Sequence, residues 1–238
     1  MFARLVMLLW IAREWLRIKR FDKKETIRIG LSMGTFNPIH LWHLQVGQCA
    51  WVQKNLKFVL FIPNGDPPHK EGVVSKWRRY KWVKWAVAGN EMFRACPIEV
   101  CREGKSYTVD TLRQLQALYT RWGYKVELCL IIGMDNVDKI PRWHQAPELL
   151  KLCKLLIAPR DSMNMTPEAI AATLPELEHE TDWSMIACPD TDMSSTLVRQ
   201  WYADPAMSHC ADYVVSNMVR RDINRDNPFR NQNLQKTA

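Results

Sequence analysis

The chain has 238 residues, of which 47% are apolar, and this describes one large domain or one domain with an appendage. No apolar run approaches the ~20 residues that a membrane-spanning helix needs. The formal charge of +8 lies mainly on the ends, because residues 1–25 carry +4, residues 220–238 carry +3 and the body carries only +1. A nucleic-acid surface should place a basic stripe on the fold itself, so we expect no nucleic-acid partner.

Residues 1–20 are predicted to form a helix, whose apolar block is followed by Arg and Lys. The segment does not resemble a signal peptide, because its charge lies on the wrong side and no small-residue cleavage site follows. Two interpretations stay open: an amphipathic helix on a membrane surface, or a helix packed on the domain. We expect a helical N-terminal extension at 1–25, a main domain at 26–225 and a disordered tail at 226–238.

From residue 27 onward, strand and helix patterns alternate, which predicts an α/β fold of the Rossmann-like, doubly wound type. Its sheet should be mostly parallel and flanked by helices. The predicted strands are 27–33, 57–62, 97–101, 126–132, 154–158 and 185–188. The predicted helices are 42–54, 75–89, 108–121, 145–151, 166–173, 195–203 and 210–219.

The turn from Gly34 to His43 is the most informative segment, because it stands where a buried strand passes into a helix. In an open α/β sheet this crevice is where ligands bind, and the free N–H groups of the helix favour phosphate. Gly34 would let a ligand approach the backbone closely. His40 and His43 lie three apart on one helical turn, so both imidazoles can face one phosphate group. Two histidines are too few for a zinc site.

Four later segments also carry polar chemistry. Lys70 follows the second strand in a Pro-rich loop and could meet a phosphate, although taken alone the loop is better explained as an ordinary Pro/Gly turn. Around Thr108, hydroxyl residues open a helix, which fits either a cap or an anion site. Asp135 follows a buried strand and Gly133, where an acid commonly contacts a ribose. Hydroxyls at 194–196 precede Arg199 at a helix start, which suits a polyphosphate or a simple cap.

In this order, the segments resemble the nicotinate-nucleotide adenylyltransferase family, which carries a Gly-x-Phe-x-Pro-x-His-x-x-His signature. The resemblance extends from about residue 27 to residue 225 and includes a Pro-Pro-His-Lys loop, a Ser-Tyr-Thr region and a closing Ser-Ser-Thr-x-x-Arg string. Further matching positions are Arg79, Ala86, Glu99, Arg102, Gly104, Ser106, Tyr107, Thr108, Thr111, Gly133, Asp135, Trp143 and Arg160. The departures are Asn37 for Asp, Met33 and Trp42 for glycines, and Asp161-Ser162 for Pro-Gly.

The resemblance implies transfer of the adenylyl group of ATP to nicotinate mononucleotide, in NAD biosynthesis. It assigns catalysis to His40, His43 and Arg199. It assigns ATP binding to Gly34, Thr35, Phe36, His40, His43, Gly133, Asp135, Ser194, Ser195, Thr196 and Arg199. It assigns mononucleotide binding to Asn37, Lys70, Tyr107, Thr108, Trp143 and Arg160, with Trp143 stacking on the nicotinate ring. Mg²⁺ would arrive with ATP, so no protein metal ligands are expected.

Other functions remain as alternatives. The same reaction on nicotinamide mononucleotide differs by one charge in the acceptor, and phosphopantetheine adenylyltransferases share the two histidines but lack the Pro-Pro-His-Lys and Ser-Tyr-Thr segments. A non-catalytic nucleotide or RNA binder would instead use the basic ends, and its binding should weaken steeply with salt. Seven scattered cysteines without a C-x-x-C pair fit a reducing, cytoplasmic compartment. The sequence does not indicate an oligomeric state.

Overall fold

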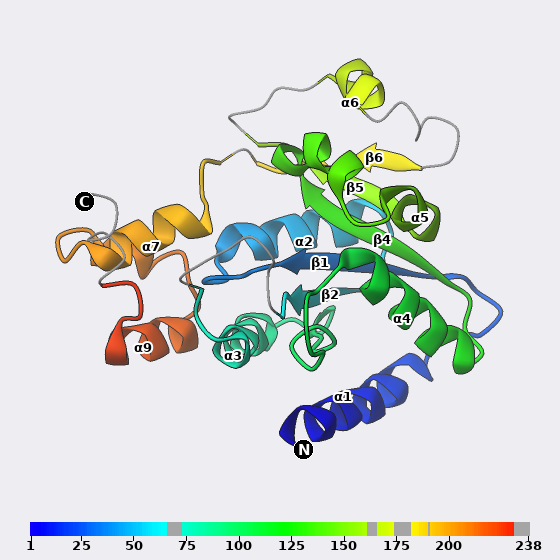
Figure 1. The fold of residues 1–238 in the computed structure, drawn as a ribbon, viewed down its shortest axis with the longest axis horizontal. Helices are drawn as coiled ribbons and strands as arrows, with labels where there is room; N and C mark the ends of the chain where they lie inside the picture. The colour runs from blue at the N-terminus through cyan, green and yellow to red at the C-terminus, as the bar shows by residue number, and fades with distance from the viewer. Residues whose placement is uncertain (66–72, 161–165, 174–181, 190, 231–238) are drawn as a thin grey trace.

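The computed structural model has a six-stranded, all-parallel sheet with the strand order β3-β2-β1-β4-β5-β6 (Figure 1). The structure describes residues 1–65, 73–160, 166–173, 182–189 and 191–230. The strands are β1 (Ile27–Gly34), β2 (Phe58–Pro63), β3 (Phe93–Ala95), β4 (Val126–Gly133), β5 (Lys154–Ala158) and β6 (Trp183–Met185). The predicted Rossmann-like fold class is confirmed.

The strand order reverses direction at β1. The chain first builds β1 to β3 outward on one side and then returns to place β4 on the other side of β1, paired from Ile27–Val126 to Ser32–Ile131. The carboxyl ends of β1 and β4 therefore border the switch point of the sheet, which is the place where open α/β sheets bind ligands.

Helices cover both faces of the sheet, which explains why the strands are apolar without alternation. Alternate strand residues enter opposite cores, as Leu60 and Phe61 do on β2. One core packs against α1, α4, α5, α6 and the 3₁₀ helix η1, and the other against α2, α3, α7, α8 and α9. The helices are α1 (Phe2–Ile18), α2 (Leu41–Gln53), α3 (Lys76–Val87), α4 (Thr108–Arg121), η1 (Met134–Arg142), α5 (Ala146–Leu152), α6 (Pro167–Thr173), α7 (Ser195–Ala203), α8 (Ser208–Ala211) and α9 (Asn217–Asp226).

Most predicted elements agree with the structure within two residues at each end, but the strand at 97–101 is wrong. The third strand is Phe93–Ala95, and residues 97–101 form a turn in which Cys101 N–H donates to Pro97 O. Cys96 N–H makes the last bond to β2, at Phe61 O. Pro97 has no N–H to continue the ladder, so the chain turns away.

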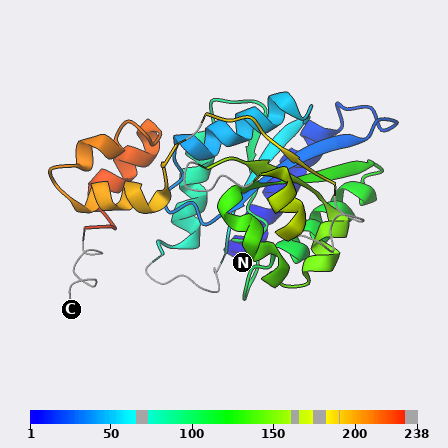
Figure 2. The ribbon, with the colours of Figure 1, turned by 90° about the horizontal axis from the view of Figure 1, so that it is seen from above.

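The helix predicted at 210–219 is also wrong, because two short helices, α8 and α9, replace it (Figure 2). The segment between α8 and α9 contacts the start of α2, where Leu41 N–H donates to Val214 O at 2.8 Å. The first N–H groups of a helix have no partner inside the helix, so this carbonyl satisfies one of them. A continuous helix through 214 would have used the same carbonyl internally.

The last strand is predicted too far along the chain, because β6 lies at Trp183–Met185 and not at 185–188. The predicted tail begins too early, because α9 extends to Asp226 and Phe229 is fully buried in the core beside Trp82 and Tyr202. Residues 226–230 thus belong to the folded domain, and residues 231–238 lie outside the described part of the chain.

The N-terminal helix α1 packs on the domain through a buried charge. Glu14 and Arg94 are each 1–2% exposed, and the Arg94 guanidinium donates to the Glu14 carboxylate at 2.6 Å. Tyr119 of α4 donates its hydroxyl to the same carboxylate at 3.0 Å, and the Arg94 guanidinium lies 3.5 Å above the ring of Phe58. These contacts fix α1 against β2, β3 and α4. Among the described helices, none is both long and apolar enough to cross a membrane.

We expect Glu14→Leu to lower the free energy of unfolding by about 3–5 kcal/mol, because it leaves the Arg94 charge buried without its partner. Urea denaturation measures the change. The double variant Glu14→Leu/Arg94→Leu removes both charges and should recover much of the loss. As a surface control, Glu148→Gln removes the exposed partner of Arg113 and should leave the midpoint almost unchanged. Equal midpoints for Glu14→Leu and the unchanged protein would contradict the role given to this pair.

Candidate active site

The predicted histidine turn lies between β1 and α2, at the switch point of the sheet. His40 is the residue before α2, and His43 lies in its first turn, with the two ring centres 3.8 Å apart. The backbone N–H of His40 donates to Nδ1 of His43 at 3.2 Å. In a neutral ring this leaves the proton on Nε2 of His43, which can donate to an anion.

The His40 imidazole is uncharged. It is 2% exposed, and its burial lowers its pKa far below the ordinary value, with a further lowering from the charges of His43 and Arg160. His40 can therefore act on an anion through a hydrogen bond, while a positive charge must come from elsewhere.

The start of α7 contacts the histidine turn and carries a positive charge, Arg199. Arg199 donates to the carbonyl of Asn37 at 3.0 Å and to the hydroxyl of Thr196 at 3.1 Å. Ser195 donates its hydroxyl to the carbonyl of Pro38 at 2.9 Å. These contacts join segments that lie about 160 residues apart, and they bring together the first and last of the predicted motifs.

Ser194 caps α7 by accepting from Leu197 N–H at 3.1 Å. The cap leaves the first N–H groups of α7 beside a half-buried guanidinium, and burial lowers the pKa of that Arg199 group. A partly desolvated cation next to a helix N-terminus is a favourable place for phosphate oxygens.

The other side chains of the histidine turn mainly make contacts within the protein. The Asn37 side chain is 5% exposed and accepts from Val74 N–H at 3.3 Å, and Phe36 is buried with its ring 5.0 Å from that of His43. A Cβ added at Gly34 would meet only the Phe36 ring, at 3.6 Å, so the fold itself tolerates a side chain there. That glycine at position 34 lets a ligand approach the backbone closely stays a prediction.

Asp135 follows β4 and forms an ion pair with Arg160 at 3.5 Å. Arg160 also influences the titration of His40, so this pair and the histidine turn share the same edge of the sheet. At Gly133, an added Cβ would collide with the Asp135 carboxylate, so glycine is required for the carboxylate to fold back over the strand end.

A second group of predicted residues gathers at the start of α4. Tyr107 precedes α4 and Thr108 begins it, and the Tyr107 ring lies 4.2 Å from that of His144. Trp143 ends η1 and packs partly against the core. The predicted mononucleotide residues of α4 and η1 therefore lie close together.

Arg79 of α3 connects these two groups. Its guanidinium is 1% exposed and donates to the carbonyls of Val74, Thr35, Asn64 and Gly65 at 2.6–2.8 Å. Thr35 belongs to the turn after β1, whereas the other three carbonyls belong to the chain around the loop after β2. One side chain thus holds the two loops in a fixed relative position.

The loop after β2 is joined in turn to α4. Gly65 N–H donates to the hydroxyl of Ser106 at 3.2 Å, and an added Cβ at Gly65 would collide with the Glu99 carbonyl. The Glu99 carboxyl is 1% exposed and accepts from the hydroxyl of Thr111 at 2.8 Å, and burial raises its pKa. Glu99, Ser106 and Thr111 hold the site in place from beneath.

Of the predicted site residues, only Lys70 lies outside the described residues, as do Asp161 and Ser162 among the departures. The role of Arg79 as a connector was missed, because a sequence does not show which backbone carbonyls surround an arginine. Trp42 is 8% exposed and packs into the core beneath α2, and Met33 packs partly against the opposite core. In the described part of the chain, no three His, Cys, Asp or Glu side chains are grouped so that they could hold a metal ion.

Comparison with known proteins shows the family of the chain. Residues 31–201 match the family model described as cytidylyltransferase-like. A protein of Synechococcus sp. named "Probable nicotinate-nucleotide adenylyltransferase" is 38% identical over 73% of this chain and 82% of the relative. A protein of the same name from Dehalococcoides mccartyi is 35% identical over 74% of this chain and 85% of the relative. This chain belongs to the nicotinate-nucleotide adenylyltransferase family.

The fold also agrees with that of solved adenylyltransferases. The structure titled "Plasmodium falciparum nicotinic acid mononucleotide adenylyltransferase complexed with NaAD" has a TM-score of 0.71 at 15% identity and covers 85% of this chain and 97% of its own. A second structure of that enzyme, titled as complexed with APC, has a TM-score of 0.69 at 14% identity. At these identities the likeness confirms the adenylyltransferase fold.

In this adenylyltransferase, Arg79→Lys should lower the free energy of unfolding by about 2–4 kcal/mol and raise KM for both substrates. Lysine keeps the charge but lacks the planar fork, so buried carbonyls lose their donors and the two loops loosen. Urea denaturation and steady-state kinetics measure the two effects. Lys84→Ala, on the exposed side of the same helix, serves as the control. An Arg79→Lys protein with unchanged stability and KM values would refute the connecting role.

Proposed function

We propose that the protein transfers the adenylyl group of ATP to nicotinate mononucleotide, which yields nicotinate adenine dinucleotide and pyrophosphate. The contact between the histidine turn and the start of α7 supports this proposal, because the two segments proposed to bind phosphate come from opposite ends of the domain and touch each other. We infer the acceptor, nicotinate mononucleotide, from the names of the relatives. The chain matches these relatives over more than four-fifths of their length.

The reaction needs no nucleophilic side chain, because the acceptor phosphate is already an anion. Its oxygen attacks the α-phosphorus of ATP, a new P–O bond forms, and the bond to pyrophosphate breaks. The task of the protein is to align two polyanions and to stabilise the charge that develops on the α-phosphate and the leaving group. Preorganised donors do this at low cost, because they need not reorient during the reaction.

In this scheme the ATP phosphates lie between the histidine turn and α7. His40 and His43 donate hydrogen bonds, and Arg199 supplies positive charge beside the first N–H groups of α7. Asp135 contacts a ribose, and its ion pair with Arg160 orients it. Among the described residues no three potential metal ligands are grouped. We propose that Mg²⁺ would arrive with ATP, bound mainly by phosphate oxygens and water.

The mononucleotide lies toward α4 and η1, with its ring against Trp143 and its polar groups near Tyr107 and Thr108. Arg79 sets the distance between this subsite and the ATP subsite, since it binds the loops on which both depend. Lys70, outside the described residues, is proposed to meet the mononucleotide phosphate.

A pyrophosphate-release assay with ATP and one acceptor at a time tests the function. Nicotinate mononucleotide should give the highest kcat/KM, and nicotinamide mononucleotide and phosphopantetheine serve as the alternative acceptors. If nicotinamide mononucleotide gave the higher kcat/KM, the acceptor would be reassigned and the adenylyl transfer kept. If no pyrophosphate were released from ATP with any of the acceptors, the proposed enzyme function would be refuted.

We expect His43→Ala to keep the fold and to lose at least about 100-fold in kcat, because one preorganised donor to the developing charge is removed. His209→Ala, an exposed histidine on α8, should have normal kinetics. Circular dichroism checks folding in both proteins. Near-normal turnover of folded His43→Ala would remove this side chain from the mechanism.

Trp143→Ala should raise KM for the mononucleotide by about 10-fold and leave KM for ATP unchanged, because only the nicotinate ring loses an aromatic face. Trp143→Phe keeps an aromatic face and should restore most of the affinity. Equal changes in both KM values would argue against stacking and for a structural role of Trp143.

A further inference from the structure

The N-terminal helix α1 has two different sides. Trp10, Glu14 and Ile18 face the domain and are buried. The opposite side carries a stripe of four leucines, and each is 53–57% exposed. We call Leu5, Leu8, Leu9 and Leu16 the leucine stripe. Because the Glu14–Arg94 pair fixes the helix, the stripe cannot turn inward to bury itself.

Large aromatic side chains extend this apolar surface at its margins. Phe2 is 64% exposed and Trp15 is 46% exposed. The Phe2 ring contacts that of Trp77 on α3, with centres 4.9 Å apart, so the surface continues from α1 toward α3. Contiguous exposed apolar surface of this kind marks an interaction site, whereas single exposed leucines do not.

Positive charge surrounds the leucine stripe. All five Lys and Arg residues of the first twenty are exposed, and the single acid among them, Glu14, is 1% exposed and already paired. The five basic residues are Arg4, Arg13, Arg17, Lys19 and Arg20. The exposed side of α1 is therefore apolar along its middle, basic along its margins, and free of exposed acidic side chains.

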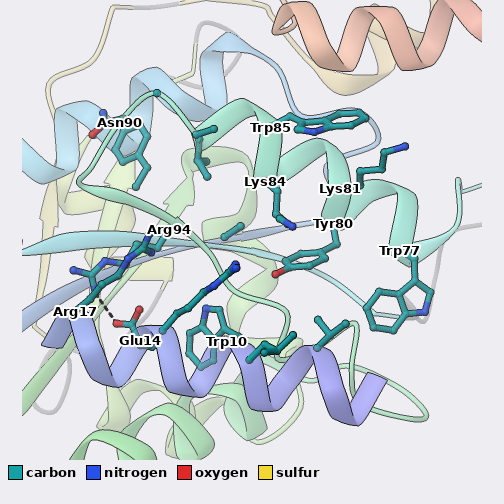
Figure 3. A pocket seen from close by; sticks show the side chains of 18 of the residues that line it. Trp10, Glu14, Arg17, Trp77, Tyr80, Lys81, Lys84, Trp85, Asn90 and Arg94 are labelled. Carbon is teal, nitrogen blue, oxygen red and sulfur yellow. Dashed lines mark hydrogen bonds and ion pairs between the residues drawn. The ribbon is translucent and has the colours of Figure 1, made fainter. Parts of the chain in front are cut away.

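A basic groove lies beside the stripe, between α1 and α3 (Figure 3). Its volume is about 1020 Å³, and its lining includes Arg13 and Arg17 of α1 together with Lys84 of α3. Lys81 also lines it but is ion-paired with Asp222, and among the described residues of the lining Glu91 is the one acid without an ion pair. Trp77 and Trp85 line the same groove from α3. Amphipathic aromatic rings next to cations are the side chains that proteins place at the headgroup level of a membrane.

We propose that α1 and this groove dock the enzyme onto the surface of a bilayer that contains anionic phospholipids. The leucine stripe enters the boundary between headgroups and acyl chains, and the cations on its margins and in the groove contact lipid phosphates. An apolar face with a basic margin and few acids is the pattern of helices that lie in the plane of a membrane.

Charge favours a bilayer over a second copy of the chain. Two copies that met through the stripe would bring their basic margins together without an exposed acid on either α1 to neutralise them. An anionic lipid surface neutralises the same charges and covers the leucines at once. This proposal does not depend on the adenylyl-transfer function, which uses residues on other elements.

Co-sedimentation of the full chain with vesicles tests the proposal. One vesicle preparation contains phosphatidylcholine with phosphatidylglycerol, and the other contains phosphatidylcholine alone. We expect at least about 10-fold more bound protein with the anionic vesicles, and a loss of this excess at about 1 M salt, where the Debye length falls to about 3 Å. Equal recovery in the supernatant with both preparations would overturn the proposal.

Two double variants separate the apolar and basic contributions. Leu5→Ser/Leu9→Ser should abolish vesicle binding, and Arg13→Gln/Arg17→Gln should remove the preference for anionic vesicles. The matched controls alter exposed residues elsewhere: Val52→Ser/Tyr213→Ser for the apolar change and Arg121→Gln/Lys125→Gln for the charge change. Adenylyl transfer in solution should be unchanged in all four proteins.

Sedimentation velocity without vesicles tests whether a second copy of the chain covers the leucine stripe instead. A protein that is dimeric, but becomes monomeric on Leu5→Ser/Leu9→Ser, would reassign the stripe to an interface between copies and overturn the membrane proposal. Unchanged vesicle binding in both double variants would do the same, since neither the leucines nor the arginines would then be in contact with lipid.

Discussion

The site depends on one buried guanidinium. Arg79 donates to carbonyls of the turn after β1 and of the chain around the loop after β2, so it fixes two loops that the sheet alone would leave independent. A parallel sheet places the carboxyl ends of its strands at one edge, but it does not set the distance between the loops that follow. A planar cation with five donors can do so, because each carbonyl that it satisfies would cost free energy if it were buried alone.

From Arg79 the constraint extends in two directions. The first leads through Thr35 to the histidine turn, which the start of α7 holds from its other side through Ser195 and Arg199. The second leads through Gly65 and Ser106 to the start of α4. Asp222 of α9 accepts hydrogen bonds from Trp82, Lys81 and Arg78 of α3, and these bonds hold α9 against α3. Burial alone would raise the pKa of Asp222, but the bonds lower it to about 2. In the proposed mechanism, alignment of two anionic substrates therefore depends on contacts that extend across the domain.

The sequence predicted the parts of this arrangement whose signals are local. Apolar runs and helix punctuation located the strands and helices, and the spacing of His40 and His43 marked the turn that lies at the switch point. At 97–101 the apolar pattern outweighed a local signal, because Pro97 cannot continue the hydrogen-bond ladder. The break in the helix predicted at 210–219 has a long-range partner that the sequence does not show, since the Val214 carbonyl accepts from Leu41 N–H. For the same reason α1 was left with two interpretations, since only the structure shows that Glu14 faces Arg94 while the leucines face outward.

A crystal structure with a non-hydrolysable ATP analogue tests the central claim most directly, because the claim concerns where a triphosphate lies relative to groups that the fold has already positioned. The account predicts that the phosphates lie between the histidine turn and the start of α7, within hydrogen-bond distance of His43 and Arg199, while the Arg79 contacts stay as they are. A triphosphate bound away from both imidazoles, or one that binds only after the loops held by Arg79 have separated, would contradict it.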